Sequence, residues 1–230
     1  MPEATSRLKG YHAKIVNYFL LIYFRQISRN KKFCIISNDC WGAEIYKVLN
    51  RPFNTPFIGL MLMSPCYIKL LENPQYYLKL PLVFKGSSNY PSMRNLNSGI
   101  SFPLATLGDS DIEIHFLHYK SEEIAKEKWD RRVKKIDWTN LFVKYDCGKD
   151  YANKDLMETF LNLPFSNKLV FGNENYGNKN VYVLKNYSTN AMVQFRNCFL
   201  NIDPINWLKR GESITNSLQK FICKIAYKYI

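Results

Sequence analysis

The spacing of apolar residues along the chain changes between the period of strands and the period of helices. Phe33 to Ile36 is a short apolar run rich in β-forming residues, and the following Ala43 to Leu49 places its apolar side chains on one helical face. The same patterns predict further strands at 112–119, 141–145 and 168–171, and helices at 121–136 and 155–163. Because strands that alternate with helices build parallel sheets, we expect an α/β fold with a layered, largely parallel sheet flanked by helices.

Amphipathic helices are predicted near both ends of the chain. Apolar residues recur at helical spacing within 11–29, but Lys14 and Arg25 interrupt them and disfavour a helix that spans a membrane. In 213–230 an apolar stripe lies beside a stripe of lysines, which is typical of a basic helix at a membrane surface. Packing against the sheet remains an alternative for both helices.

The composition supports one domain and favours anionic partners. A chain of 230 residues, of which 47% are hydrophobic, can bury a full core, so we expect a single α/β domain over residues 1–230 with the two helices at its ends. The net charge of +13 favours nucleic acid, the anionic inner leaflet of a membrane, or phosphorylated substrates. Because the basic residues are dispersed and no nucleic-acid module is recognisable, sequence-specific nucleic-acid binding is not expected.

Cysteine usage favours a reducing compartment. The six cysteines are scattered without a C-x-x-C pair, and the sequence shows no cleavable signal with a small-residue cleavage site. These features predict free thiols, a cytoplasmic location and no structural zinc site. The basic helix at 213–230 adds a peripheral contact with the inner face of the membrane as a further expectation.

The polar residues after the first predicted strand form the first candidate site. Ligands of open α/β sheets bind at the carboxyl ends of strands, which is where Ser37, Asn38, Asp39, Cys40 and Trp41 fall. Cys40 also lies near the start of the next predicted helix, where the helix dipole and free backbone amides favour a thiolate. The sequence therefore predicts a site here, with Cys40 as a nucleophile.

The predicted strand 112–119 forms the second candidate site. Its period of two places Glu113, His115 and Tyr119 on one side and His118 on the other. A bend near Tyr119 would release His118 toward Cys40 if the two strands are parallel neighbours. An imidazole within hydrogen-bond reach of a sulfur is the arrangement that a Cys/His pair requires. The candidate catalytic residues are therefore Cys40, His115 and His118, and the candidate substrate-binding residues are Ser37, Asn38, Asp39, Trp41, Glu113 and Tyr119.

Three sequence blocks occur in a specific combination: Ser37–Gly42, Pro56–Leu60, and Gly108–Glu123 followed by Lys128–Arg132. Together they resemble a bacterial family of uncharacterised proteins often labelled exopolysaccharide biosynthesis proteins. The resemblance implies a two-layer or three-layer α/β fold and a place among capsule or lipopolysaccharide assembly proteins. Family members tend to read Ser-Asn-Asn-Cys-Trp-Gly-Gly in the first block, so Asp39 and Ala43 depart from the pattern and put a backbone role for its last glycine in doubt.

Three functions remain open at this point. The first is a Cys/His-dependent transferase that moves an acyl or related group onto a saccharide. The second is a divalent-metal site for phosphoryl chemistry, formed by loop and strand residues Asp109, Asp111, Glu113 and His115. The third is a non-catalytic protein that binds a lipid-linked saccharide or a glycosyltransferase at the membrane.

The first of these is the function that we predict, in the biosynthesis of a cell-surface polysaccharide. No metal ligand is assigned, and the sequence does not identify a cofactor. A nucleotide-sugar enzyme with an ordinary dinucleotide fold is disfavoured, because the first strand-to-helix turn has no G-x-G-x-x-G and no glycine-rich phosphate cradle.

Overall fold

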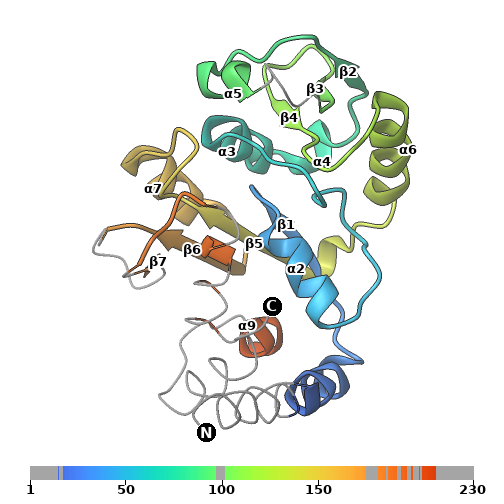
Figure 1. The fold of residues 1–230 in the computed structure, drawn as a ribbon, viewed down its shortest axis with the longest axis vertical. Helices are drawn as coiled ribbons and strands as arrows, with labels where there is room; N and C mark the ends of the chain where they lie inside the picture. The colour runs from blue at the N-terminus through green and yellow to red at the C-terminus, as the bar shows by residue number, and fades with distance from the viewer. Residues whose placement is uncertain are drawn as a thin grey trace, which may run out of the picture.

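The computed structural model describes most of the chain and shows two sheets with helices around them (Figure 1). The described residues are 15, 18–96, 102–174, 181–184, 186–190, 193–195, 198, 202 and 204–210. The helices are α2 (Trp41–Val48), α3 (Ser64–Glu72), α4 (Pro74–Tyr77), α5 (Pro91–Leu96), α6 (Glu122–Val133), the 3₁₀ turn η1 (Trp138–Asn140), α7 (Lys154–Asn162) and α9 (Pro204–Arg210).

The main sheet has four parallel strands in the order β1-β5-β6-β7. They are β1 (Cys34–Ser37), β5 (Leu141–Asp146), β6 (Asn167–Gly172) and β7 (Val181–Val183). Every residue of β1 and β5 is buried, as expected for parallel strands that are covered on both faces. The predicted α/β fold with a largely parallel sheet and flanking helices is therefore confirmed.

A second sheet has three short antiparallel strands in the order β2-β3-β4, and the sequence patterns did not predict it. They are β2 (Leu82–Phe84), β3 (Leu104–Leu107) and β4 (Glu113–His115). The predicted strand 112–119 is wrong in length, because the chain turns where Leu117 N donates to His115 O and Tyr119 N donates to Phe116 O. The condition under which His118 would reach Cys40, that this strand and β1 are parallel neighbours, is not met, because β4 belongs to the antiparallel sheet.

Residues 58–62 connect the two sheets. Met61 pairs with His115 of β4 through two antiparallel hydrogen bonds of 2.9 and 3.0 Å. The next residue, Leu62, donates its backbone N–H to Asn38 O just after β1. The loop after β1 and the end of β4 are thus held to one extended segment rather than to each other.

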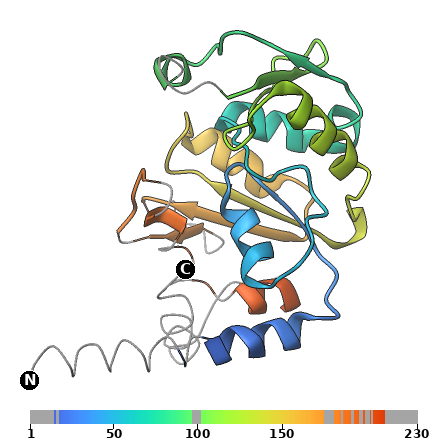
Figure 2. The same ribbon diagram turned by 45° about the vertical axis from the view of Figure 1, so that its right-hand side comes forward.

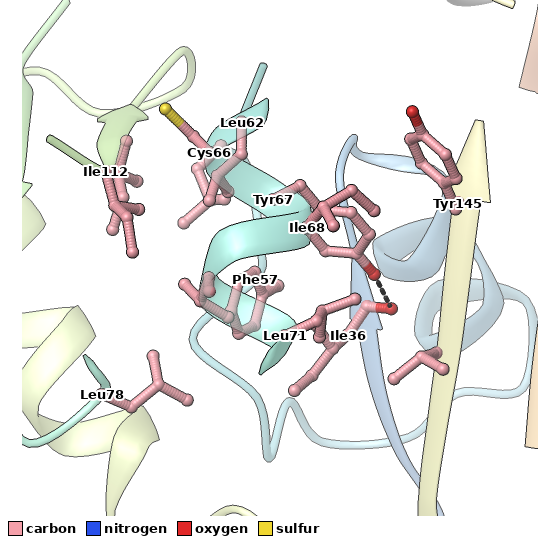
Figure 3. Packing of buried hydrophobic residues seen from close by; sticks show 14 of the residues in the cluster. Ile36, Phe57, Leu62, Cys66, Tyr67, Ile68, Leu71, Leu78, Ile112 and Tyr145 are labelled. Atoms are coloured by element: carbon pink, nitrogen blue, oxygen red, sulfur yellow. Dashed lines mark hydrogen bonds between the residues drawn. The ribbon is translucent and has the colours of Figure 1, made fainter. Parts of the chain in front are cut away.

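Two hydrophobic clusters cover the two faces of the main sheet. One lies between β1 and β5, α3, α6, α7 and the antiparallel sheet, and the other contains residues of α2, α9 and the helix at 18–28. In the first cluster Cys66 lies on the side of Ile112, and Tyr67 lies on the side of β1, where its hydroxyl donates to Ile36 O at 3.0 Å (Figure 3). Alternate residues of a strand face opposite clusters, which explains the unbroken apolar runs.

Only part of the two predicted terminal helices falls within the described residues. The helix at 18–28 is present, whereas the predicted helix 213–230 lies outside the described residues. The full extent of the predicted single domain, 1–230, stays a prediction for the same reason. None of the helices in the part of the chain that the structure describes is long and apolar enough to cross a membrane.

Candidate functional site

A buried cluster of charged side chains lies at the carboxyl ends of β1 and β5. Lys144 of β5 is paired in register with Ser37 of β1, and its ammonium lies 2.7 Å from the Oδ2 of Asp39. Both side chains are almost entirely removed from solvent. An opposite charge at this distance is required for either group to remain ionised in a low-dielectric interior.

Asp39 is held by four donors. Ser37 Oγ and Trp41 N donate to its Oδ1 at 2.9 and 3.1 Å, and Lys149 adds a second ammonium 3.3 Å from its Oδ2. Burial alone would raise the pKa of this carboxyl, but the charges of Lys144 and Lys149 and these hydrogen bonds hold the pKa well below its ordinary range. Asp39 is therefore an ionised anchor between the two strands.

Asn38 extends the pairing of β1 and β5 through its side chain. Its Nδ2 donates to Asp146 O, and its Oδ1 accepts from Asp146 N at 3.0 Å. The Asp146 carboxylate in turn accepts from Gly148 N and from the Tyr187 hydroxyl, at 3.2 and 2.6 Å. A Cβ at Gly148 would meet the Tyr187 ring at 2.4 Å, so glycine allows this hydroxyl to reach Asp146.

A cavity of about 500 Å³ opens beside this cluster, in the loop after β5. It is lined by residues 147–154 and by Asn173 and Glu174 after β6. Lys149 and Asp150 both line it, although only 11% and 18% of their side-chain surfaces are exposed. The cavity therefore sits at the carboxyl edge of a parallel sheet, the usual position for a ligand in such folds.

Asp150 is the least satisfied charged group of this loop. Its Oδ2 is buried and has no hydrogen-bond partner among the described residues, and the ammonium of Lys149 is 3.8 Å away. Burial raises the pKa of the carboxyl to about 6, despite the opposing charge of Lys149. A carboxyl that titrates near neutral pH is suited to general acid and base chemistry.

The backbone of the same loop is strained. Asp150 and Tyr151 have φ angles of +57° and +61°, a region that residues other than glycine rarely adopt. The N-terminus of α3 holds the loop, because Ser64 N donates to Asp150 O at 2.8 Å and Ser64 Oγ donates to Lys149 O. Strain of this kind persists only where surrounding contacts enforce it, and it concentrates at functional sites.

The structure brings the predicted residue Cys40 to the N-cap of α2, as expected, but not into a Cys/His pair. Its Sγ donates to Leu60 O at 3.7 Å. Burial, with the negative charges of Asp39 and Glu44, raises the pKa of the thiol to about 12. A helix dipole contributes at most about 2 kcal/mol at a partly buried site, so it does not offset these effects. The catalytic role of Cys40 stays a prediction that this environment disfavours.

Alkylation of the native protein with iodoacetamide tests that role. We expect Cys40 to react slowly at neutral pH, because only the thiolate is nucleophilic, and to react faster only at strongly alkaline pH. Peptide mass spectrometry would give the rate for each cysteine, with the protein unfolded in guanidinium as the reference in which all six react alike. Rapid and selective modification of Cys40 at pH 7 would restore the nucleophile hypothesis.

His115 and Glu113 lie together in β4 and are not among the residues that line the cavity. Glu113 is fully buried and accepts from Ser88 Oγ and Asn89 N, at 2.6 and 2.8 Å. The His115 Nε2 is 3.6 Å from the Glu113 carboxylate, and burial lowers the pKa of the imidazole to about 4. Glu113 thereby supports the loop at 88–89, whereas the buried His115 Nε2 has no hydrogen-bond partner within the described residues. The predicted roles of both residues stay predictions.

His118 and Tyr119 lie beside the segment that connects the sheets. His118 N donates to Gly59 O, and the Tyr119 hydroxyl donates to Ile58 O at 2.7 Å. Arg132 of α6 donates to the same hydroxyl at 2.7 Å. These contacts join the third sequence block to the second, whose Leu60 O accepts from Cys40 Sγ. Among the described residues, no hydrogen bond joins Cys40 to either histidine.

Trp41 belongs to the core beneath the site. Its ring packs against Phe171 and Trp207, with ring centroids 5.4 and 5.9 Å away.

The metal hypothesis requires a cluster of ligands. Within the described residues, no group of three or more His, Cys, Asp or Glu side chains is arranged to hold a metal ion. The proposed set of Asp109, Asp111, Glu113 and His115 is therefore not supported.

Four residues of the cluster and loop were not predicted from the sequence: Lys144, Asp146, Lys149 and Asp150. One signal was present in the sequence. A lysine interrupts the otherwise apolar run of β5, and acidic residues follow it at the carboxyl end of the strand. A charge inside a fully buried strand requires a partner, so a lysine in such a strand indicates a buried ion pair.

Comparison with known proteins gives the family of the chain. Residues 12–211 match the model of a family described as domain of unknown function DUF1919. An uncharacterized protein of Haemophilus influenzae (strain ATCC 51907 / DSM 11121 / KW20 / Rd) is 31% identical over 188 residues, which cover 81% of this chain and 84% of that protein. The chain with the charged cluster and cavity described above therefore belongs to the DUF1919 family.

Proposed function

We propose that this protein acts in the biosynthesis of a cell-surface polysaccharide, as a transferase that binds a saccharide in the cavity after β5. One observation carries the proposal. Asp150 lines the cavity with a buried carboxyl whose Oδ2 lacks a hydrogen-bond partner within the described residues. A buried polar atom without a partner is unfavourable for folding, so its presence in the lining of a cavity indicates a role in contact with a ligand.

The lining of the cavity suits a saccharide. Asn173, Lys149 and Lys154 offer N–H donors, and Asp150 and Glu174 offer carboxylate acceptors. Sugar hydroxyls both donate and accept, so they can satisfy such a mixed set. Tyr151 adds an aromatic face against which the apolar side of a sugar ring can pack. The resemblance to exopolysaccharide biosynthesis proteins supports the link to a surface polysaccharide.

The proposed chemistry uses Asp150 as a general base. The ionised carboxylate takes the proton of an acceptor hydroxyl while the hydroxyl oxygen bonds to the group that is transferred, and the leaving group departs with its electron pair. The nearby Lys149 ammonium, 3.8 Å from the Asp150 carboxylate, favours the ionised form of the carboxyl before the reaction. The location that we propose is the inner face of the membrane, where the net charge of +13 favours contact with anionic lipid.

A non-catalytic saccharide-binding protein, or a partner of a glycosyltransferase, is the second candidate. The polar lining and Tyr151 favour it equally, because they concern binding alone. Asp150→Asn distinguishes the two. A catalyst would keep its ligand and lose about 100-fold or more in turnover, whereas a binding protein would retain its biological function.

Binding of sugars to the cavity can be measured by saturation-transfer NMR. We expect a panel of free hexoses, N-acetylhexosamines and their nucleotide derivatives to contain at least one ligand. Its signal should weaken in Tyr151→Leu, because the aromatic face is lost. Tyr76→Leu, which removes another exposed tyrosine outside this cavity, is the matched control. Absence of binding across the panel, or an equal loss in both variants, would contradict the proposal.

A further inference from the structure

The helix at 18–28 exposes an apolar stripe on the outside of the molecule. Residues Ile15, Tyr18, Phe19, Ile22 and Tyr23 have side chains that are 42–63% exposed. Their spacing of three and four residues places them on one side of a helix. We call these five residues the N-terminal face.

The opposite side of this helix is already packed. Phe24 is buried in the cluster that contains Trp207 and Leu208 of α9, and Leu20 and Ile27 pack partly against the same cluster. Figures 1 and 2 show the helix beside α9, at the end of the molecule away from the antiparallel sheet. A helix that is apolar on two sides needs two apolar environments, and the fold supplies one.

The charge of the sequence that flanks the N-terminal face indicates what the second environment is. Residues 4–38 include seven lysines and arginines and no aspartate or glutamate. Arg29 and Lys32 follow the helix directly, and both are exposed. A second copy of the chain would bring the same positive charge to the contact. An anionic lipid surface offers the opposite charge, and its acyl boundary accommodates Phe19 and Ile22.

We propose that the N-terminal face lies in the headgroup region of an anionic membrane. Phe19 and Ile22 contact the acyl boundary, while the phenol rings of Tyr18 and Tyr23 lie at the level of the headgroups, where tyrosine is enriched. Arg29 and Lys32 contact lipid phosphates. The inference rests on the membrane location in the proposed function and names the surface that makes the contact, independently of the cavity.

Co-sedimentation with lipid vesicles tests the inference. We expect the protein to bind vesicles of phosphatidylcholine with about 30% phosphatidylglycerol at least about tenfold more tightly than pure phosphatidylcholine vesicles, and high salt should weaken the binding. Phe19→Glu/Ile22→Glu should lose about tenfold or more of this affinity. The matched control is Tyr76→Glu/Val83→Glu, which places the same charges on two exposed apolar residues elsewhere.

A second variant distinguishes a lost membrane contact from misfolding. Arg29→Ser/Lys32→Ser changes only exposed side chains, and it should weaken binding to the anionic vesicles without a change in circular dichroism or melting temperature. Asp150→Asn should bind vesicles like the wild type, so a failure of the catalytic proposal would be separate from a failure here.

Three results would overturn the inference. Equal binding to neutral and anionic vesicles would remove the role of charge. Unchanged binding of Phe19→Glu/Ile22→Glu would show that another surface makes the contact. A wild-type dimer in light scattering that the same variant dissociates, without any vesicle binding by the wild type, would show that a second copy covers this face.

Discussion

Lys144→Met is expected to lower the free energy of unfolding by about 3–5 kcal/mol. The variant removes the ammonium 2.7 Å from Asp39 and leaves that carboxylate buried, with only Lys149 as a charged partner at 3.3 Å. The hydrocarbon part of the side chain is replaced by methionine, so lost packing contributes little. Urea unfolding followed by fluorescence, with the midpoint and slope fitted as a two-state transition, measures the change.

Two further variants test whether the loss of stability comes from the buried charge of Asp39. Lys126→Met breaks an exposed ion pair of 2.6 Å with Asp130, and we expect it to cost less than about 1 kcal/mol. Asp39→Asn/Lys144→Met removes both charges and should recover part of the loss, because position 39 then carries no buried charge that has lost its partner. A Lys144→Met effect no larger than that of Lys126→Met would show that water or a rearranged side chain compensates Asp39.

The main sheet was predictable because each of its central strands is a short, mostly apolar run that can be recognised from local sequence. β1 and β5 are apolar except at Ser37, Lys144 and Asp146, since both of their faces are covered. The strands of the antiparallel sheet are three or four residues long. Runs that short are not separable from turns by periodicity, and their pairing depends on residues far away in the sequence.

The candidate site was predictable in position but not in composition. The rule that ligands bind at the carboxyl ends of parallel strands placed Ser37 to Cys40 at the correct edge of the sheet. Asp39, however, has its main partner 105 residues later, at Lys144. Such a pair cannot be inferred from local spacing. The thiolate predicted at Cys40 depended on the helix dipole, whereas burial and two neighbouring carboxylates have the larger effect on its pKa.

Asp150→Asn is expected to stabilise the protein at neutral pH. Asp150 has a carboxyl pKa of about 6 in the folded protein against an ordinary value of 3.8. At pH 7 the carboxyl is ionised, and the folded protein disfavours this ionised form relative to the unfolded chain. The difference corresponds to at most about 3 kcal/mol. Asparagine carries no charge and tolerates the positive φ of +57° at this position. A residue that lowers stability where a neutral isostere would raise it is typical of a functional site.

The pH dependence of this gain follows from the direction of the pKa shift. A raised pKa means that the folded protein binds the proton more tightly, so the contribution to stability is complete below pH 3.8 and is lost as the pH rises to about 6. The melting temperature of Asp150→Asn should therefore equal that of the wild type near pH 4 and exceed it by several degrees at pH 7. Asp109→Asn, at an exposed turn, should show no such divergence. If Asp150→Asn melts below the wild type at pH 7, Asp150 is a stabilising partner of Lys149, and its assignment as the general base loses its physical basis.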